Sequence, residues 1–174
     1  MHAHPKPNIL ILMGVSGCGK TTLGRALAEA TDGTFLDGDD VHSESNRRKM
    51  ESGTALDDED RREWLESIAR FITHQKDGTK PVFIACSALK QSYREILLSA
   101  DPEIIFLFLT TDPDILRQRI TERHQSGGHF MPPSLLDSQL ATLEIPADAM
   151  ELDASEPVAE LVRRVWPRIR REPV

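Results

Sequence analysis

The stretch Gly14-Val-Ser-Gly-Cys-Gly-Lys20-Thr21 matches the pattern G-x-x-x-x-G-K-[ST] at every fixed position. The short apolar run Asn8–Met13 precedes it, and Thr22–Ala30 follows with apolar residues at helical spacing, namely Leu23, Leu27 and Ala30. Strand, glycine loop and helix together distinguish a phosphate-binding loop from a glycine-rich turn with an exposed lysine. Inward-pointing N–H groups and the positive end of the helix dipole favour a nucleoside triphosphate.

This loop assigns chemical roles to its residues. Lys20 is expected to reach the β- and γ-phosphates, and the Thr21 hydroxyl to ligate Mg²⁺. Cys18 stands at a variable position, where a filler role is expected. The nucleotide is expected to contact Gly14, Val15, Ser16, Gly17, Cys18, Gly19, Lys20, Thr21 and Thr22.

Length and charge limit the class of protein. The 174 residues fit a single domain, 1–174, and suffice for a core without disulfides. The net charge of -7 argues against a nucleic-acid or anionic-membrane surface. No apolar run approaches the roughly 20 residues that span a bilayer, and residues 1–8 lack the apolar region of a secretory signal. With only two cysteines, the chain is expected to be cytoplasmic, with neither nucleic acid nor membrane as partner.

Strand-like and helix-like segments alternate along the chain. Strands are predicted at Ile9–Met13, Thr34–Leu36, Val82–Cys86, Ile104–Leu109 and, more weakly, Met150–Leu152. Helical patterns include Asp58–His74 and Ser155–Trp166, the latter with Ser155 as N-cap and Pro157 in the first turn. The alternation predicts an α/β fold with three α/β/α layers and a central, mostly parallel five-stranded sheet.

Two carboxylates follow the second predicted strand, in Leu36-Asp37-Gly-Asp39-Asp40. Ligands of open parallel sheets lie at the carboxyl ends of the strands. If this strand neighbours the phosphate-loop strand and the segment stays extended, Asp37 and Asp39 lie on one side near the γ-phosphate. One carboxylate would then hold Mg²⁺ through water, and the other would accept a proton from a hydroxyl nucleophile. The alternative is a solvated acidic turn, which the position after a strand disfavours.

Several cations are candidate ligands of anions. Arg47, Arg48, Lys49 and Arg61 either capture an anionic substrate or form a solvated helix face, and Lys90, like Ser87, lies at the ligand edge after the third strand. Arg119 and Arg123 share a helix face that suits phosphates, although a solvated stripe has the same pattern. The following segment, Gln125–Pro133, has the glycines and prolines of a mobile lid that excludes water, or of an ordinary surface loop. Asp112, before Pro113, is interpreted as a helix cap.

Together these pieces resemble the gluconate kinase family, within the shikimate and nucleoside-monophosphate kinase group of phosphate-loop proteins. The resemblance spans about residues 9 to 145 and includes the turn Asp37-Gly-Asp39 and Tyr93-Arg94. Its specific matches are Cys86-Ser-Ala-Leu-Lys90 and Gly128-His-Phe130, which are not general to phosphate-loop kinases. It implies a P-loop kinase fold with a helical substrate-binding segment at about 40–75 and a mobile lid at about 119–134. It also implies ATP and Mg²⁺, transfer to the 6-hydroxyl of D-gluconate, and a homodimer as in many family members.

The resemblance further implies roles by position. Lys20, Asp39 and Arg123 would be catalytic, and Arg119 and Arg123 would contact the nucleotide. Thr21 and Asp37 would hold the metal. Contacts to the sugar acid would come from Asp39, His42, Lys49, Arg61, Lys90, Arg94 and His129. Extra residues in the lid, Gln125 to Gly127, depart from the family pattern.

Other classes of function remain as rivals. A nucleoside-monophosphate kinase needs no base, so the pair Asp37 and Asp39 favours a hydroxyl acceptor. A GTP-dependent switch normally reads guanine with Asn-Lys-x-Asp, which does not occur here. A noncatalytic ATP-binding scaffold would be expected to lose Lys20 or Asp39, and both are present. The exact sugar acid and the oligomeric state are left open by the sequence.

Overall fold

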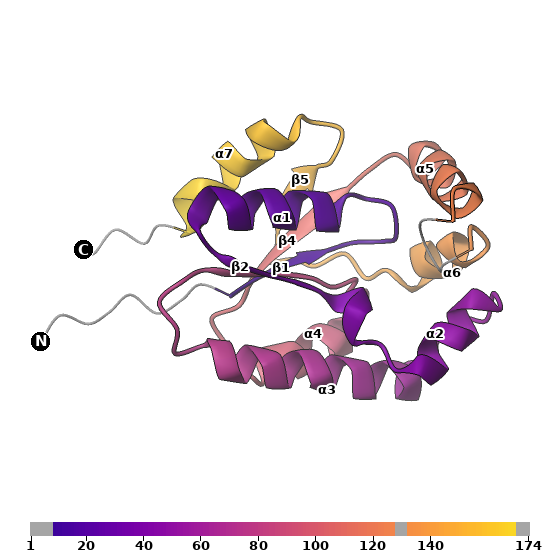
Figure 1. Ribbon diagram of the computed structural model, residues 1–174, viewed down its shortest axis with the longest axis horizontal. Coiled ribbons are helices and arrows are strands. Elements are labelled where there is room, and N and C mark those ends of the chain that lie inside the picture. The colour runs from indigo at the N-terminus through magenta and orange to yellow at the C-terminus, as the bar shows by residue number, and fades with distance from the viewer. Residues whose placement is uncertain (1–8, 128–131, 170–174) are drawn as a thin grey trace, which may run out of the picture.

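The computed structural model describes residues 9–127 and 132–169. Figure 1 shows their elements, which follow one another as β1 (Ile9–Met13), α1 (Lys20–Thr31), β2 (Thr34–Asp37), the 3-10 helix η1 (Gly38–Val41), α2 (Glu44–Glu51), α3 (Asp58–Gln75), β3 (Val82–Ala85), α4 (Gln91–Leu98), β4 (Ile105–Thr110), α5 (Pro113–Gln125), α6 (Leu135–Thr142), β5 (Met150–Asp153) and α7 (Val158–Ile169). No helix among these residues is long and apolar enough to cross a membrane.

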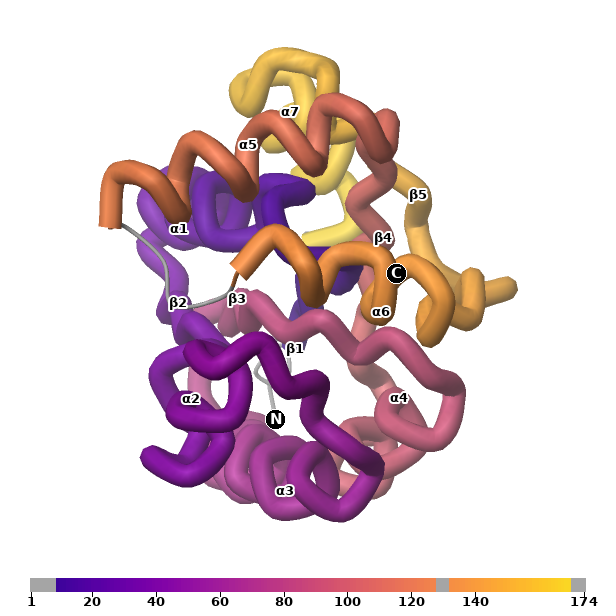
Figure 2. The backbone as a smooth tube through the Cα atoms, turned by 90° about the vertical axis from the view of Figure 1, so that its right-hand side faces the viewer, coloured from indigo at the N-terminus to yellow at the C-terminus, as the bar shows by residue number. Residues whose placement is uncertain are grey.

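The five strands form one parallel sheet in the order β2-β3-β1-β4-β5. Helices α1 and α7 cover one face, and α3 and α4 cover the other (Figure 1). Helices α2, α5 and α6 gather at the end of the molecule where the glycine loop leaves β1, as the view onto that end shows (Figure 2). The predicted three-layer α/β/α fold with a five-stranded sheet is therefore confirmed.

The predicted neighbourhood of the second strand is wrong, because β3 lies between β1 and β2. All four residues of β3 are buried, whereas all four residues of β2 are only partly buried. A fully apolar strand belongs inside a covered sheet, and a half-buried strand suits the edge. Asp37 nevertheless ends β2 opposite Ala85 of β3, at the carboxyl edge of the sheet.

The start of the last helix also differs from the prediction. α7 begins at Val158 rather than Ser155, and the N–H of Leu161 donates to the carbonyl of Pro157. The N–H of Ser155 donates instead to the Asp153 carboxylate, which forms a turn after β5. Ser155 is therefore not the N-cap, because its backbone is used by this turn.

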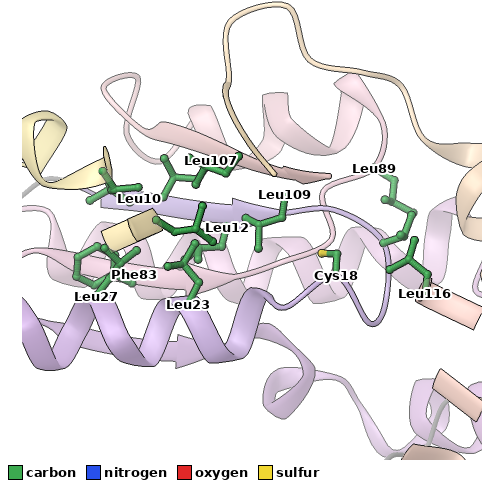
Figure 3. Packing of buried hydrophobic residues seen from close by; sticks show 14 of the residues in the cluster. Leu10, Leu12, Cys18, Leu23, Leu27, Phe83, Leu89, Leu107, Leu109 and Leu116 are labelled. Carbon is green, nitrogen blue, oxygen red and sulfur yellow. The ribbon is translucent and has the colours of Figure 1, made fainter. Parts of the chain in front are cut away.

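The core has one apolar cluster on each face of the sheet. Every residue of β1 is buried, and its alternate side chains enter the two clusters. Figure 3 shows the cluster under α1, in which Cys18 of the glycine loop is fully buried near Leu109 and Leu116. The same cluster continues along the sheet through Leu10, Leu12, Leu23, Leu27 and Leu107. The loop is thus fixed to the sheet by packing as well as by its backbone.

Candidate active site

The glycine loop turns sharply between β1 and α1. Gly14 has φ 140, and a Cβ there would lie 2.8 Å from the carbonyl oxygen of Leu109, so only glycine fits. The N–H of Gly14 donates to the carbonyl of Ser87, 3.3 Å away. Lys20 Nζ donates to the carbonyls of Gly14 and Val15 at 3.0 and 2.9 Å. The lysine ammonium is thereby held against the loop, where a phosphate group would meet it.

A cavity of about 550 Å³ opens at this loop. Residues Ser16 to Thr22 line it, together with Asp37, Asp39, Arg119 and Arg123. Gly14 and Val15 do not line it, and their carbonyls hold Lys20 instead. The segment from β5 into α7 contributes four residues that were not among the predicted site residues, namely Ala154, Glu156, Val158 and Leu161. The rule that ligands lie at carboxyl ends of parallel strands, applied to the fifth strand, would have indicated them.

Thr21 and Asp37, the two residues predicted to hold Mg²⁺, lie in direct contact. Thr21 Oγ1 donates to Asp37 Oδ2 at 2.7 Å, and both residues line the larger cavity. Kinases usually hold Mg²⁺ with one or two carboxylates, phosphate oxygens and water, so this hydroxyl and carboxylate fit the ion.

The segment after Asp37 is not extended, contrary to the prediction. The Asp37 carboxylate caps η1 by accepting from the N–H of Asp39 at 3.1 Å, and this bond bends the chain into a 3-10 turn. Both carboxylates still line the larger cavity.

A second, smaller cavity of about 40 Å³ adjoins the first. Its walls come from the glycine loop, η1, α2, α3, α6 and the segments after α2 and β3, and are formed by Ser16, Lys20, Asp39, His42, Met50, Leu56, Arg61, Trp64, Ser87 and Gln139. Ser16, Lys20 and Asp39 line both cavities. The two cavities therefore meet at the loop lysine and a carboxylate.

His42 is packed as a neutral ring beside Asp39. Its ring stacks on Trp64, with centroids 4.3 Å apart and an interplanar angle of 16°. Burial lowers the pKa of His42 from 6.5 to about 4, and the nearby Asp39 opposes this shift only in part. His42 Nε2 lies 4.0 Å from Asp39 Oδ1, and Nδ1 is buried without a hydrogen-bond partner among the described residues. The indole is itself fixed, because Trp64 Nε1 donates to the carbonyl of Gly38 at 2.7 Å.

Arg61 is the predicted substrate cation that lines the smaller cavity. It is 9% exposed, and its Nε donates to the carbonyl of Leu56 at 3.2 Å. Its guanidinium carbon lies 5.6 Å from the centroid of the Tyr93 ring, within the range of a cation–π interaction. The side chain is thus oriented by both contacts.

Lys49 and Lys90 are placed differently from Arg61, and neither lines either cavity. Lys49 Nζ lies 2.6 and 2.8 Å from the Asp60 oxygens, and Lys90 Nζ lies 2.7 Å from Asp58 Oδ1. These hydrogen bonds lower the pKa of both carboxyls. Acidic side chains are favoured in the first turn of a helix, and here they engage the lysines. Of Lys49, Arg61 and Lys90, only Arg61 therefore lines the smaller cavity, although Lys90 Nζ lies 5.4 Å from the centroid of the Tyr93 ring that Arg61 also contacts.

The remaining predicted residues fall into three groups. Arg94 is 3% exposed and lies outside both cavities, and its Nη1 donates to the carbonyls of Ala88 and Leu89 at 2.9 and 3.3 Å. Arg119 lines the larger cavity with Arg123, and its Nη1 lies 3.4 Å from the carbonyl of Gly17. His129 lies outside the described residues.

Two helix contacts complete the site. Asp112 accepts from the N–H of Asp114 at 2.8 Å with Pro113 in the first turn, which confirms its capping role. Gln139 of α6 is buried, and its Oε1 accepts from the N–H of Ser16 at 2.7 Å. No local spacing in the sequence indicates this contact, because Gln139 lies 123 residues from Ser16 along the chain.

Comparisons with known proteins agree with this geometry. A family model described as an AAA domain matches residues 9–146. A gluconokinase from Gluconobacter oxydans (strain 621H) is 44% identical over 143 residues, which are 82% of this chain and 79% of that protein.

Solved structures are similar over nearly the whole chain. A gluconokinase from Sinorhizobium meliloti 1021 superposes with a TM-score of 0.79 and 40% identity, over 94% of this chain and 91% of that one. A sugar kinase from Janibacter sp. HTCC2649 has a TM-score of 0.84 and 39% identity, over 94% of this chain and 95% of that one. Fold and sequence therefore point to the same family.

Proposed function

The chain belongs to the gluconokinase family, and from this premise we propose that it transfers the γ-phosphoryl group of ATP to the 6-hydroxyl of D-gluconate, giving 6-phospho-D-gluconate and ADP. The observation that carries the proposal is the shared wall of the two cavities. Ser16, Lys20 and Asp39 line both, so a donor in one and an acceptor in the other would meet there. An in-line transfer needs this adjacency.

The larger cavity is assigned to ATP. The N–H groups of the loop and Lys20 bind the phosphates, and Arg119 and Arg123 contribute positive charge from α5. Thr21 and Asp37 would hold Mg²⁺, which would supply positive charge against the phosphates of ATP. The segment from β5 into α7 forms the wall of the larger cavity at the β5 edge of the sheet, whereas η1 follows β2 at the opposite edge.

The smaller cavity is assigned to the acceptor. Its volume of about 40 Å³ receives only part of a six-carbon acid, so the rest lies across its mouth. Asp39 orients the 6-hydroxyl and accepts its proton, and Arg61 pairs with the carboxylate of the acid. His42, neutral at pH 7, forms part of the cavity wall beside Asp39. Lys49, Lys90 and Arg94 do not line this cavity, and they support it by holding its surrounding elements in place.

The proposal extends to the setting of the reaction. Residues 1–174 act as one domain, with a helical acceptor-binding segment at about 40–75 and a lid at about 119–134 that excludes water. A homodimer is proposed from the family resemblance, and a cytoplasmic location from the low cysteine content of the chain.

A coupled assay of ADP formation tests the proposed function. D-gluconate, other sugar acids, glucose, shikimate and nucleoside monophosphates are offered in turn with ATP and Mg²⁺. We expect turnover of gluconate and poor turnover of glucose, because glucose leaves the buried Arg61 unpaired. Turnover of a monophosphate in place of gluconate would overturn the proposal.

The same assay tests the phosphate loop. Lys20→Ala is expected to lower kcat on the order of 10²-fold or more, since one preorganised electrostatic contact is lost. Folding should be unchanged, because Lys20 faces the cavities rather than the core. The matched control is Lys76→Ala at the exposed end of α3, which should behave as the parent. A folded Lys20→Ala protein with parental turnover would contradict the assignment.

A further inference from the structure

The short connection between β3 and α4 contains a strained residue. Ala88 has φ 43, a left-handed conformation that residues other than glycine rarely adopt, and it is fully buried. Such strain persists only where surrounding contacts determine the backbone, and it is often found at functional sites. The contacts of this connection therefore indicate which side chain the strained backbone positions.

Three separate elements hold the connection in place. Arg94 of α4 donates to the carbonyls of Ala88 and Leu89. The N–H of Glu144, after α6, donates to the carbonyl of Leu89 at 2.8 Å, and the N–H of Gly14 donates to the carbonyl of Ser87. The backbone on both sides of Ser87 is thus fixed relative to the phosphate loop.

The result of this arrangement is the position of the Ser87 side chain. Ser87 lines the smaller cavity with Asp39, His42, Arg61 and Gln139. Its hydroxyl has no hydrogen-bond partner within residues 9–127 and 132–169, although a hydroxyl both donates and accepts. A polar group without a partner, set on a cavity wall by a strained turn, is suited to a ligand.

We propose that the Ser87 hydroxyl binds a hydroxyl group of the acceptor and helps to select a polyhydroxy acid, and that Arg94 is a positioning residue that acts through the Ala88 turn. This inference rests on the proposed function, because it takes the smaller cavity as the acceptor site. It gives Arg94 a role without contact to the substrate, in agreement with its place outside both cavities.

The first test is Ser87→Ala, with Ser92→Ala on the exposed first turn of α4 as the matched control. We expect Ser87→Ala to raise the KM for gluconate roughly 3- to 10-fold, the range of one neutral hydrogen bond, with the KM for ATP unchanged. The control should keep both constants. Thermal unfolding verifies that both variants fold as the parent does.

A series of monodeoxy gluconates identifies the partner of Ser87. The parent should lose affinity for the analogue that lacks the contacted hydroxyl, and Ser87→Ala should lose nothing further with that analogue. Equal additional losses with every analogue would overturn the contact.

The role of Arg94 is tested by a double-mutant cycle on the KM for gluconate at saturating ATP. If Arg94 acts through Ser87, Arg94→Met raises this KM in the parent and has little further effect in Ser87→Ala. A merely structural role would give the same additional loss in both backgrounds, and that outcome would overturn the positioning role. Arg94→Lys, which keeps one donor toward the turn, should restore part of the loss.

Failure of this inference is distinguishable from failure of the proposed function. A parent protein that does not phosphorylate gluconate contradicts the proposed function. A parent that phosphorylates gluconate, together with a Ser87→Ala variant of parental KM, overturns the inference alone.

Discussion

Asp37 and Asp39 lie two residues apart, yet the structure gives them different neighbours. Asp37 accepts from the Thr21 hydroxyl, whereas Asp39 faces both cavities and lies near the His42 ring. The difference separates a carboxylate that supports the metal from one that serves the acceptor. It follows that the two residues should respond differently to removal of their charge.

We expect Asp39→Asn to bind ATP with parental affinity but to lower kcat by roughly 10²–10⁴-fold, the usual contribution of a general base. Asp37→Asn should instead require more Mg²⁺ for half-maximal rate, because one oxygen ligand loses its charge. Calorimetry with ATP and rates measured against Mg²⁺ concentration check both variants. Gluconate turnover by Asp39→Asn at the parental rate would place the base elsewhere.

His42 should make folding sensitive to acid. Its pKa is about 4 in the folded chain and 6.5 when unfolded, because desolvation outweighs the opposing effect of Asp39, and Arg47 and Arg61 add to the lowering. The unfolded state therefore binds the extra proton first, and stability falls as the pH drops from about 6.5 to about 4. The full shift corresponds to about 3 kcal/mol.

Urea unfolding of the parent and of His42→Asn between pH 7 and pH 4 measures this contribution. We expect the parent to lose more stability than the variant over that range, whatever their difference at pH 7. Carboxylates such as Asp58 and Asp60 titrate in both proteins and cancel in the comparison. If the free energies of unfolding of the two proteins change in parallel with pH, the His42 ring is not held neutral.

At the scale of elements, the first turn of α3 and its buried face make different contacts. Its first turn carries the carboxylates that bind Lys49 of α2 and Lys90 before α4, and its buried face carries Arg61 and Trp64 to the smaller cavity. The helix therefore joins the acceptor site to its neighbours. Replacement of Arg61 should therefore change the KM for gluconate more than replacement of Lys49 or Lys90.

Replacing Arg61 by Met keeps the apolar stem and removes the guanidinium. The KM for gluconate should rise roughly 10- to 100-fold, because a charged hydrogen bond to the carboxylate is lost, and the KM for ATP should stay nearly constant. Lys49→Met and Lys90→Met serve as controls and should affect the KM for gluconate much less. Steady-state kinetics of the three variants measure these effects, and equal increases of the KM for gluconate in all three would contradict the assignment of Arg61 alone to the carboxylate.

At the scale of the whole molecule, the two cavities share a wall formed by Ser16, Lys20 and Asp39. Gln139 ties Ser16 to α6, and a small apolar cluster of Met50, Leu56 and Leu135 ties α2 to the same helix. Ligands in the two cavities thus contact one connected set of elements. Their effects on stability should be measurable in a single unfolding transition.

Thermal unfolding with ligands checks this expectation. A non-hydrolysable ATP analogue or gluconate at about 100 times its Kd should raise Tm by roughly 5–10 °C, from about 2.7 kcal/mol of binding energy. The ATP analogue and gluconate together should raise Tm by at least the sum of their separate shifts. Glucose at the same concentration as gluconate should have little effect on Tm. Gluconate that fails to shift Tm at any concentration would contradict the assignment of the smaller cavity.

The sequence by itself determined the features that depend on neighbours along the chain. The glycine loop, the five strands and the cap at Asp112 follow from residue spacing and local hydrogen bonds, and each lies within a residue or two of its predicted place. The carboxyl edge of the sheet was also predictable, because parallel strands bring their ends together.

Only the tertiary structure decided which distant segments meet. Burial placed β3 between β1 and β2, since the more apolar strand belongs inside the sheet. Electrostatics paired Lys49 and Lys90 with the first turn of α3, and packing brought Gln139 to the amide of Ser16. The spacing of residues along the chain does not indicate such contacts. Each of these side chains could pair with many others, and only the folded chain brings one of them within a few ångströms.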